Sequence, residues 1–184
     1  RIIKREGIGL DVVSGGELYT ALSADFPADK IIFHGNNKAY DEIELAVVSN
    51  VGLIVVDYAE ELNMIDDIAK KNDKRVNIIA RITPNVDSYT HKYISTGQID
   101  SKFGIPSDDE SLKNFVELAL SKEHLSLKGF HFHVGSQLFE NTSHLLAVEK
   151  MFQCMDKLEE WFDYFPEILN VGGGYGIKYK ETDA

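Results

Sequence analysis

The chain has 184 residues and a net charge of -11 at pH 7, and hydrophobic residues make up 43% of it. This length suits one sizeable hydrophobic core, and the composition is typical of a globular protein. The acidic balance argues against a nucleic-acid partner, because phosphate backbones demand a basic face. No apolar run approaches the roughly 20 residues of a membrane helix, so no membrane contact is expected. A single cysteine, Cys154, excludes a disulfide framework and favours the cytoplasm.

Apolar runs with the spacing of strands alternate along the chain with runs that have the spacing of helices. The predicted strands cover residues 9–13, 30–34, 53–56, 76–82, 128–134 and 168–171. The predicted helices lie near residues 1–6, 14–22, 39–47, 57–69, 107–119 and 143–162. Such alternation favours a parallel sheet, either doubly wound or closed into a barrel.

Three helix starts are predicted from polar residues. Ser14 followed by Glu17, and Ser107 followed by Glu110, have the spacing of a capping box. Asp57 stands just after an apolar strand and is expected to cap the helix that follows.

The loops favour the barrel. The long ones follow strands, and a (β/α)8 barrel keeps its active site on that side, often with phosphate bound after strands seven and eight. If the turn Gly172–Gly174 binds phosphate after strand seven, the six predicted strands are strands two to seven. We therefore expect an incomplete (β/α)8 TIM-type barrel, with residues 1–184 as part of one barrel domain. The start at Arg1 without a Met agrees with a truncated chain.

The stretch Lys128–Gln137 is where we expect the chemistry. His131 and His133 are two apart on a predicted strand, so they share one face, and the Phe and Val residues beside them share the other. The histidines could be zinc ligands, for which His34 at another strand end is a weak third, or a ring-stacking or hydrogen-bonding pair beside a cofactor, or satisfied core residues. Ser136 follows, with a hydroxyl and an N–H that suit an anion.

Other residues have both an ordinary and a functional interpretation. Gly172, Gly173 and Gly174 could cradle a phosphate with bare N–H groups or could form a tight turn. Asp11 and Arg81 interrupt apolar strands; they could form an ion pair inside the barrel, set the charge around a ligand at its rim, or do both.

Two lysines and one long loop complete the candidates. Lys38 and Lys102 stand in loops at strand ends, where an amine could form a Schiff base, but a solvated lysine is the simpler reading of each. His91, Lys92, Tyr93 and Ser101 belong to the long loop after Arg81, which suggests a lid.

These segments together resemble diaminopimelate decarboxylases, which are pyridoxal-phosphate enzymes of the alanine-racemase-like barrel class. The most specific match is Thr90–Gln98 followed by Asp100–Gly104. The broader decarboxylase class, including ornithine decarboxylase, shares His133-Val134-Gly135-Ser136 and the triple glycine. Further matches are Leu10–Leu18, His34–Lys38 and Arg81–Pro84.

The resemblance implies roles for particular residues. His133 would stack on the pyridine ring of pyridoxal 5'-phosphate. Ser136 and the turn Gly172–Gly174, chiefly Gly174, would hold its phosphate, and Asp11 and Arg81 would flank it. The Schiff-base lysine is expected upstream of Arg1, on the first barrel strand. A C-terminal β-domain and the substrate-binding residues are expected beyond Ala184.

The activity that the resemblance implies is decarboxylation of meso-2,6-diaminopimelate to L-lysine and CO2, the last step of lysine biosynthesis, by a homodimer with shared active sites. We expect the 184-residue chain alone to be inactive. The alternatives are a related decarboxylase of carboxynorspermidine, arginine or ornithine, a metal-dependent barrel hydrolase, or a catalytically silent regulator that keeps the fold.

Overall fold

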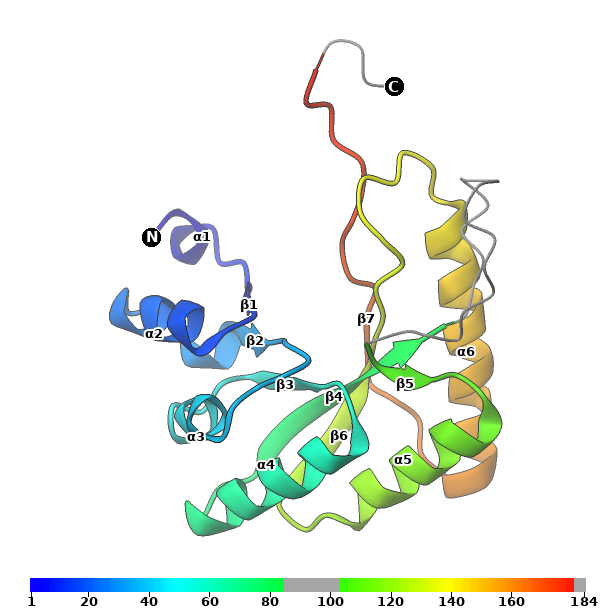
Figure 1. Ribbon diagram of the computed structural model, residues 1–184, viewed down its shortest axis with the longest axis horizontal. Coiled ribbons are helices and arrows are strands. Elements are labelled where there is room, and N and C mark those ends of the chain that lie inside the picture. The colour runs from blue at the N-terminus through cyan, green and yellow to red at the C-terminus, as the bar shows by residue number, and fades with distance from the viewer. Residues whose placement is uncertain (85–102, 181–184) are drawn as a thin grey trace.

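The computed structural model describes residues 1–84 and 103–180, and its centre is one curved parallel sheet (Figure 1). Six strands are hydrogen-bonded in the order β1-β2-β3-β4-β6-β7, and the short β5 pairs with β4. Every pairing is parallel. The strands are β1 (Leu10–Val12), β2 (Ile31–Phe33), β3 (Leu53–Val56), β4 (Val76–Thr83), β5 (Ile105–Pro106), β6 (Leu125–His131) and β7 (Ile168–Asn170).

Helices α2 to α6 form an arc around the curved sheet, as Figure 1 shows. A sheet that curls within a layer of helices is part of a barrel wall, so the predicted incomplete (β/α)8 barrel is confirmed. The helices are α1 (Ile2–Arg5), α2 (Gly15–Ser23), α3 (Tyr40–Val48), α4 (Ala59–Lys71), α5 (Asp109–Ser121) and α6 (Thr142–Phe162).

All six predicted strands are present, with ends that differ from the prediction by no more than three residues. β5 was not predicted, because it has two residues and forms only by pairing with the end of β4. Strand-forming signals in a sequence need a longer apolar run than this.

The centre of the sheet is buried on both faces. In β3, Ile54, Val55 and Val56 are each at most 1% exposed. Helix α4 places Leu62 and Ile65 on the core side, both fully buried, as the helical spacing predicts. Among the described residues, no helix combines the length and the apolar character needed to cross a membrane.

Two of the predicted helix caps are wrong. α5 begins at Asp109 instead of Ser107, and its cap is Asp108, whose carboxylate accepts the N–H three residues on. α4 has Tyr58 as its N-cap, so the side chain of Asp57 is free for another role. The cap of α2 is half right, because Ser14 accepts the N–H of Glu17 at 3.2 Å but the Glu17 carboxylate bonds elsewhere.

A register shift in β6 brings the next strand unusually close. The pairing with β4 skips one residue, so Ile78 faces Leu127 and Ile79 faces Gly129. A Cβ on Gly129 would lie 1.8 Å from the carbonyl oxygen of Ile168 on β7. Only glycine therefore allows β7 to pack here.

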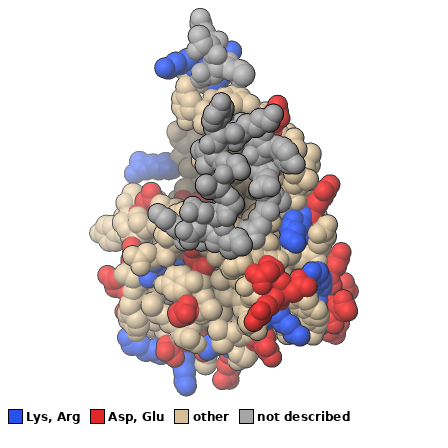
Figure 2. Space-filling view, turned by 45° about the vertical axis from the view of Figure 1, so that its right-hand side comes forward, with Lys and Arg blue, Asp and Glu red and all other residues tan. Residues whose placement is uncertain are grey.

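The surface that Figure 2 shows carries Asp and Glu side chains interspersed with Lys and Arg. On this face the acidic side chains are most numerous at the lower right, with Lys and Arg side chains beside them. Such a surface is typical of a solubilising exterior.

The buried stripe of α4 gives a test of the fold. Leu62→Ala removes a side chain with no solvent exposure, and we expect it to lower the free energy of unfolding by about 2–5 kcal/mol. Leu120→Ala on α5 is the matched control, since Leu120 is 43% exposed and its loss should cost less than about 1 kcal/mol. Urea denaturation of both variants measures the difference, and equal losses would contradict the described packing.

Candidate active site

A cavity of about 470 Å³ opens at the carboxyl ends of the strands. This is the side where parallel barrels bind their ligands. The cavity is lined by Asp11, Val13, His34, Gly35, Asn36, Arg81, Phe103, His131, His133, Gly172 and Gly173. Five of the seven residues predicted to bind the cofactor therefore meet around one space, although they come from four separate strand ends.

His131 forms part of the buried floor of this cavity. It is 5% exposed, and its Nδ1–H donates to the carbonyl oxygen of Asn170 at 3.3 Å. Its ring meets that of His34 edge to face, with centroids 4.8 Å apart. Burial, together with the charges of His34 and Arg81, lowers the pKa of His131 to about 4, so the ring is neutral at pH 7.

His34 did not enter the predicted cofactor site. It was considered only as a weak metal ligand, because an isolated histidine has no distinctive spacing. Its position directly after β2 was the available signal, since residues at the carboxyl ends of parallel strands converge on one rim.

His133 lies beyond the end of β6, and its side chain is exposed to the cavity. Its ring stands beside the glycine turn, because a Cβ on Gly172 would lie 3.2 Å from Nδ1. Burial, and then the positive charge of Arg81, lowers the pKa of His133 below its ordinary value. An imidazole ring that faces a cavity suits the face of an aromatic ligand.

The interpretation that paired Asp11 with Arg81 inside the barrel is wrong in the described structure. Asp11 Oδ1 lies 3.6 Å from Nε2 of His34, and this contact lowers the pKa of the carboxyl. Arg81 Nη1 lies 3.4 Å from Oδ1 of Asp57, and its guanidinium stacks over the ring of Phe103 at 4.7 Å. Both Asp11 and Arg81 nevertheless line the cavity, as the rim interpretation predicted.

The prediction of a solvated side chain at Lys38 is also wrong. Lys38 is 3% exposed, and its Nζ lies 2.7 Å from Oε1 of Glu61, which is fully buried. Lys102 and the predicted lid residues His91, Lys92, Tyr93 and Ser101 lie outside the described residues.

The three glycines of the turn have different reasons to be glycine. Gly172 and Gly174 have φ values of +69° and +88°, which favour glycine, and a Cβ on Gly174 would lie 1.8 Å from the carbonyl oxygen of Gly135. A Cβ on Gly173, in contrast, would meet nothing within 4 Å. The tight-turn interpretation thus explains Gly172 and Gly174, and Gly173 leaves open space on the cavity side.

The glycine turn has backbone N–H groups that are not used by the described residues. The N–H of Gly172 donates to Oδ1 of Asn170, whereas those of Gly173 and Gly174 donate to no residue that the structure describes. Backbone N–H groups without a nearby side chain are what a phosphate needs. The turn is held in place from the β6–α6 loop, because Leu138 N–H donates to the Gly174 carbonyl at 2.9 Å.

Ser136 lies on that same β6–α6 loop and is exposed. Ser136 and Gly174 do not line the cavity in its described shape. They border it through the contact of Gly174 with Gly135, so the loop and the turn form one rim.

The zinc interpretation has little support from the geometry. Within residues 1–84 and 103–180, no three His, Cys, Asp or Glu side chains are grouped so that they could hold a metal ion. His131 also uses its Nδ1 for a backbone carbonyl.

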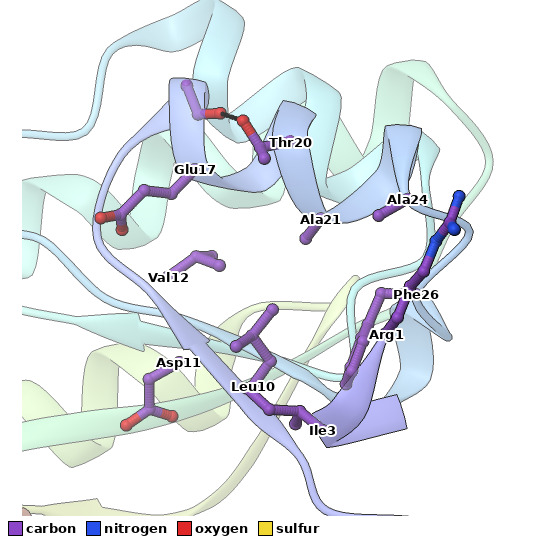
Figure 3. Close-up of a pocket in the computed structure, with 11 residues that line it drawn as sticks. Arg1, Ile3, Leu10, Asp11, Val12, Glu17, Thr20, Ala21, Ala24 and Phe26 are labelled. Carbon is purple, nitrogen blue, oxygen red and sulfur yellow. Dashed lines mark hydrogen bonds between the residues drawn. The ribbon is translucent and has the colours of Figure 1, made fainter. Parts of the chain in front are cut away.

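A second cavity, of about 410 Å³, lies between α1, β1 and α2 (Figure 3). Figure 3 shows Val12 on the side of β1 that faces α2, with Asp11 on the opposite side. Leu10, Ala21 and Phe26 give this cavity an apolar lining. Its lining is thus more apolar than that of the cavity at the strand ends.

The fold and the site together define a class: a parallel barrel domain whose strand-end cavity combines an imidazole face with a glycine turn that has open backbone N–H groups. Residues 1–184 match the family described as "Pyridoxal-dependent decarboxylase, pyridoxal binding domain". The chain belongs to this family.

The similar proteins point to one branch of the family. The chain is 44% identical over 183 residues to diaminopimelate decarboxylase of Bacillus subtilis and 47% identical over 186 residues to that of Bacillus methanolicus. Each alignment covers 100% of this chain but 42% of the relative. A crystal structure of diaminopimelate decarboxylase from M. jannaschii in complex with L-lysine matches 99% of this chain and 42% of its own, with a TM-score of 0.89 and 36% identity.

The lowered pKa of His131 predicts a pH dependence of folding. The folded pKa is about 4 and the ordinary value is 6.5, so between these values the unfolded chain binds more protons. The contribution of His131 to the free energy of unfolding is therefore fully present above about pH 6.5 and is lost as the pH drops towards 4. In this range the free energy of unfolding changes with a slope from this group that approaches about 1.4 kcal/mol per pH unit. Urea denaturation between pH 4 and 7 measures the slope. His131→Gln keeps a donor for the Asn170 carbonyl but cannot titrate, so its free energy of unfolding should fall less steeply with pH. An unchanged slope would contradict this account.

Proposed function

We propose that the cavity at the strand ends binds pyridoxal 5'-phosphate. His133 faces the pyridine ring, and Ser136 with the turn Gly172–Gly174 holds the phosphate. Asp11 and Arg81 flank the cofactor from β1 and β4. The single observation that carries the proposal is the meeting of the His133 ring with the open backbone of the glycine turn in one cavity.

The bound cofactor supplies an electron sink for a carbanion. The residues of this chain orient it and set its electrostatic surroundings. The buried His131 is neutral at pH 7, while the Arg81 guanidinium supplies a positive charge to the cavity. Burial of the ring against His133 also excludes water from one of its faces.

The reaction that we propose is decarboxylation of meso-2,6-diaminopimelate to L-lysine and CO2, by a carboxy-lyase of lysine biosynthesis. The support is the identity of 44–47% to diaminopimelate decarboxylases along the entire chain, and the likeness to a structure that contains L-lysine. The chain spans 42% of the length of these relatives, so substrate and assembly belong to the proposal.

The proposal assigns residues 1–184 to part of the barrel that binds the cofactor. The Schiff-base lysine, the first barrel strand and a C-terminal β-domain are assigned to the remainder of the full-length protein. The assembly is a cytoplasmic homodimer with shared active sites, and it binds neither nucleic acid nor membrane. Residues 1–184 alone are expected to release no CO2.

A substrate comparison tests the proposed reaction. The full-length protein with pyridoxal phosphate should release CO2 from meso-diaminopimelate at least about a hundredfold faster, in kcat/KM, than from ornithine, arginine or carboxynorspermidine, because a site that pairs with the second carboxylate of diaminopimelate rejects substrates whose far end lacks one. A preference for one of the others would keep the cofactor and replace the substrate. No turnover, with stoichiometric zinc by elemental analysis, would favour the hydrolase alternative.

The role of His133 has its own test. His133→Ala removes the ring face, and we expect the dissociation constant of pyridoxal phosphate to rise about five- to tenfold, since such ring contacts contribute roughly 1 kcal/mol. His133→Phe keeps a ring and should stay within about threefold of wild type. Fluorescence titration of the full-length protein measures both. Equal losses in the two variants would show that stacking is not what His133 provides.

A further inference from the structure

A buried ion pair stands behind the proposed cofactor site. Lys38 is 3% exposed and Glu61 fully buried, and Nζ lies 2.7 Å from Oε1. The lysine also donates to the carbonyl oxygens of Gly35 at 2.6 Å and Val55 at 2.7 Å. Three oxygen atoms thus surround an ammonium that has three hydrogens. Because a buried ion pair is weak support for stability as such, its presence calls for another explanation.

The pair clamps the carboxyl end of β3. Oε2 of Glu61 accepts the N–H of Asp57 at 2.9 Å, while Lys38 holds the carbonyl of Val55 two residues earlier. The backbone on both sides of Val56 is therefore fixed by buried charged groups. Burial raises the pKa of Glu61, and the charge of Lys38 opposes this rise, so the carboxylate depends on the lysine for its ionised form.

The clamped residue, Asp57, reaches the cavity through its side chain. Asp57 is 4% exposed, and its Oδ2 accepts the N–H of Gly104 at 3.1 Å. Its Oδ1 lies 3.4 Å from Nη1 of Arg81, which lines the cavity. The contacts run without a gap from Lys38 and Glu61 through Asp57 to Arg81.

We propose that Lys38 and Glu61 are positioning residues that act through Asp57 to hold Arg81 in the orientation that binds the cofactor. The inference rests on the proposed function, because it assigns Arg81 a task toward pyridoxal phosphate. The same lysine also fixes the Gly35 carbonyl in the β2–α3 loop, directly after His34. One buried ion pair therefore holds backbone groups on two sides of the cavity.

A double-mutant cycle distinguishes two roles of the ion pair: positioning Arg81 for the cofactor, and only holding α4 against β3. The readout is the dissociation constant of pyridoxal phosphate for the full-length protein, measured by fluorescence titration. The four proteins are wild type, Glu61→Gln, Arg81→Met and the double variant. Residues that act through one another give non-additive effects, whereas independent ones add.

We expect Glu61→Gln to raise the dissociation constant about tenfold when Arg81 is present and less than about twofold in the Arg81→Met background. The glutamine has the shape of glutamate and keeps an oxygen for the Asp57 N–H, but it lacks the charge that fixes Lys38. A repeat with Lys38→Met combined with Glu61→Gln leaves no unpaired buried charge, so a folding defect would not hide the result.

Lys71→Met is the matched control. Lys71 also lies on α4 and pairs with Glu44 at 2.7 Å, but its side chain is 61% exposed. Its removal should leave the dissociation constant unchanged.

The outcomes are distinct. Additive effects of Glu61→Gln and Arg81→Met, or no effect of Glu61→Gln on binding, would overturn the inference and leave the proposed function standing. Loss of native circular dichroism in Glu61→Gln and also in the Lys38→Met, Glu61→Gln variant would show that the pair only holds the helix against the sheet, and would overturn the inference as well. Failure of the wild-type protein to bind pyridoxal phosphate would instead overturn the proposed function, and the inference with it.

Discussion

The parallel register of β4, β6 and β7 is the constraint on which the site depends. Arg81 pairs with His131 across β4 and β6, and His131 pairs with Asn170 across β6 and β7. These three residues therefore form a row at the carboxyl end of the sheet. The register shift before Gly129 sets this row, since without it the neighbours of Arg81 would be one residue out of step and on the other face.

Around this row the charges are arranged so that the floor of the cavity stays neutral. Burial lowers the pKa of His131, and the charged side chains of Asp11 and Arg81 stand at the sides with partners of their own. Asp57 is central to this arrangement, because its carboxylate faces Arg81 while its backbone is fixed by Glu61. Buried charges in this part of the barrel thus form a connected network, and each has a partner, as the cost of burial demands.

The glycine turn joins the last strand to the loop after β6. Gly174 fits against the carbonyl of Gly135 because it has no side chain, and the Leu138 N–H donates to the Gly174 carbonyl beside this contact. The rim that faces the proposed phosphate is therefore built by two loops that are about 40 residues apart in the chain. The N–H of Gly172 is used by Asn170, and those of Gly173 and Gly174 donate to no described residue, so these two donors remain available.

The sequence by itself determined the alternation of strands and helices and the positions of Asp11, Arg81, His133 and the glycine turn at strand ends, because periodicity and turn residues are local properties. The tertiary structure decided the partners. Lys38 resembles a solvated lysine until helix α4 brings Glu61 against it, and Asp57 resembles a helix cap until β4 places Arg81 beside it. A pairing between distant residues depends on register and packing across the sheet, and no local pattern in one chain records which strand lies next to which.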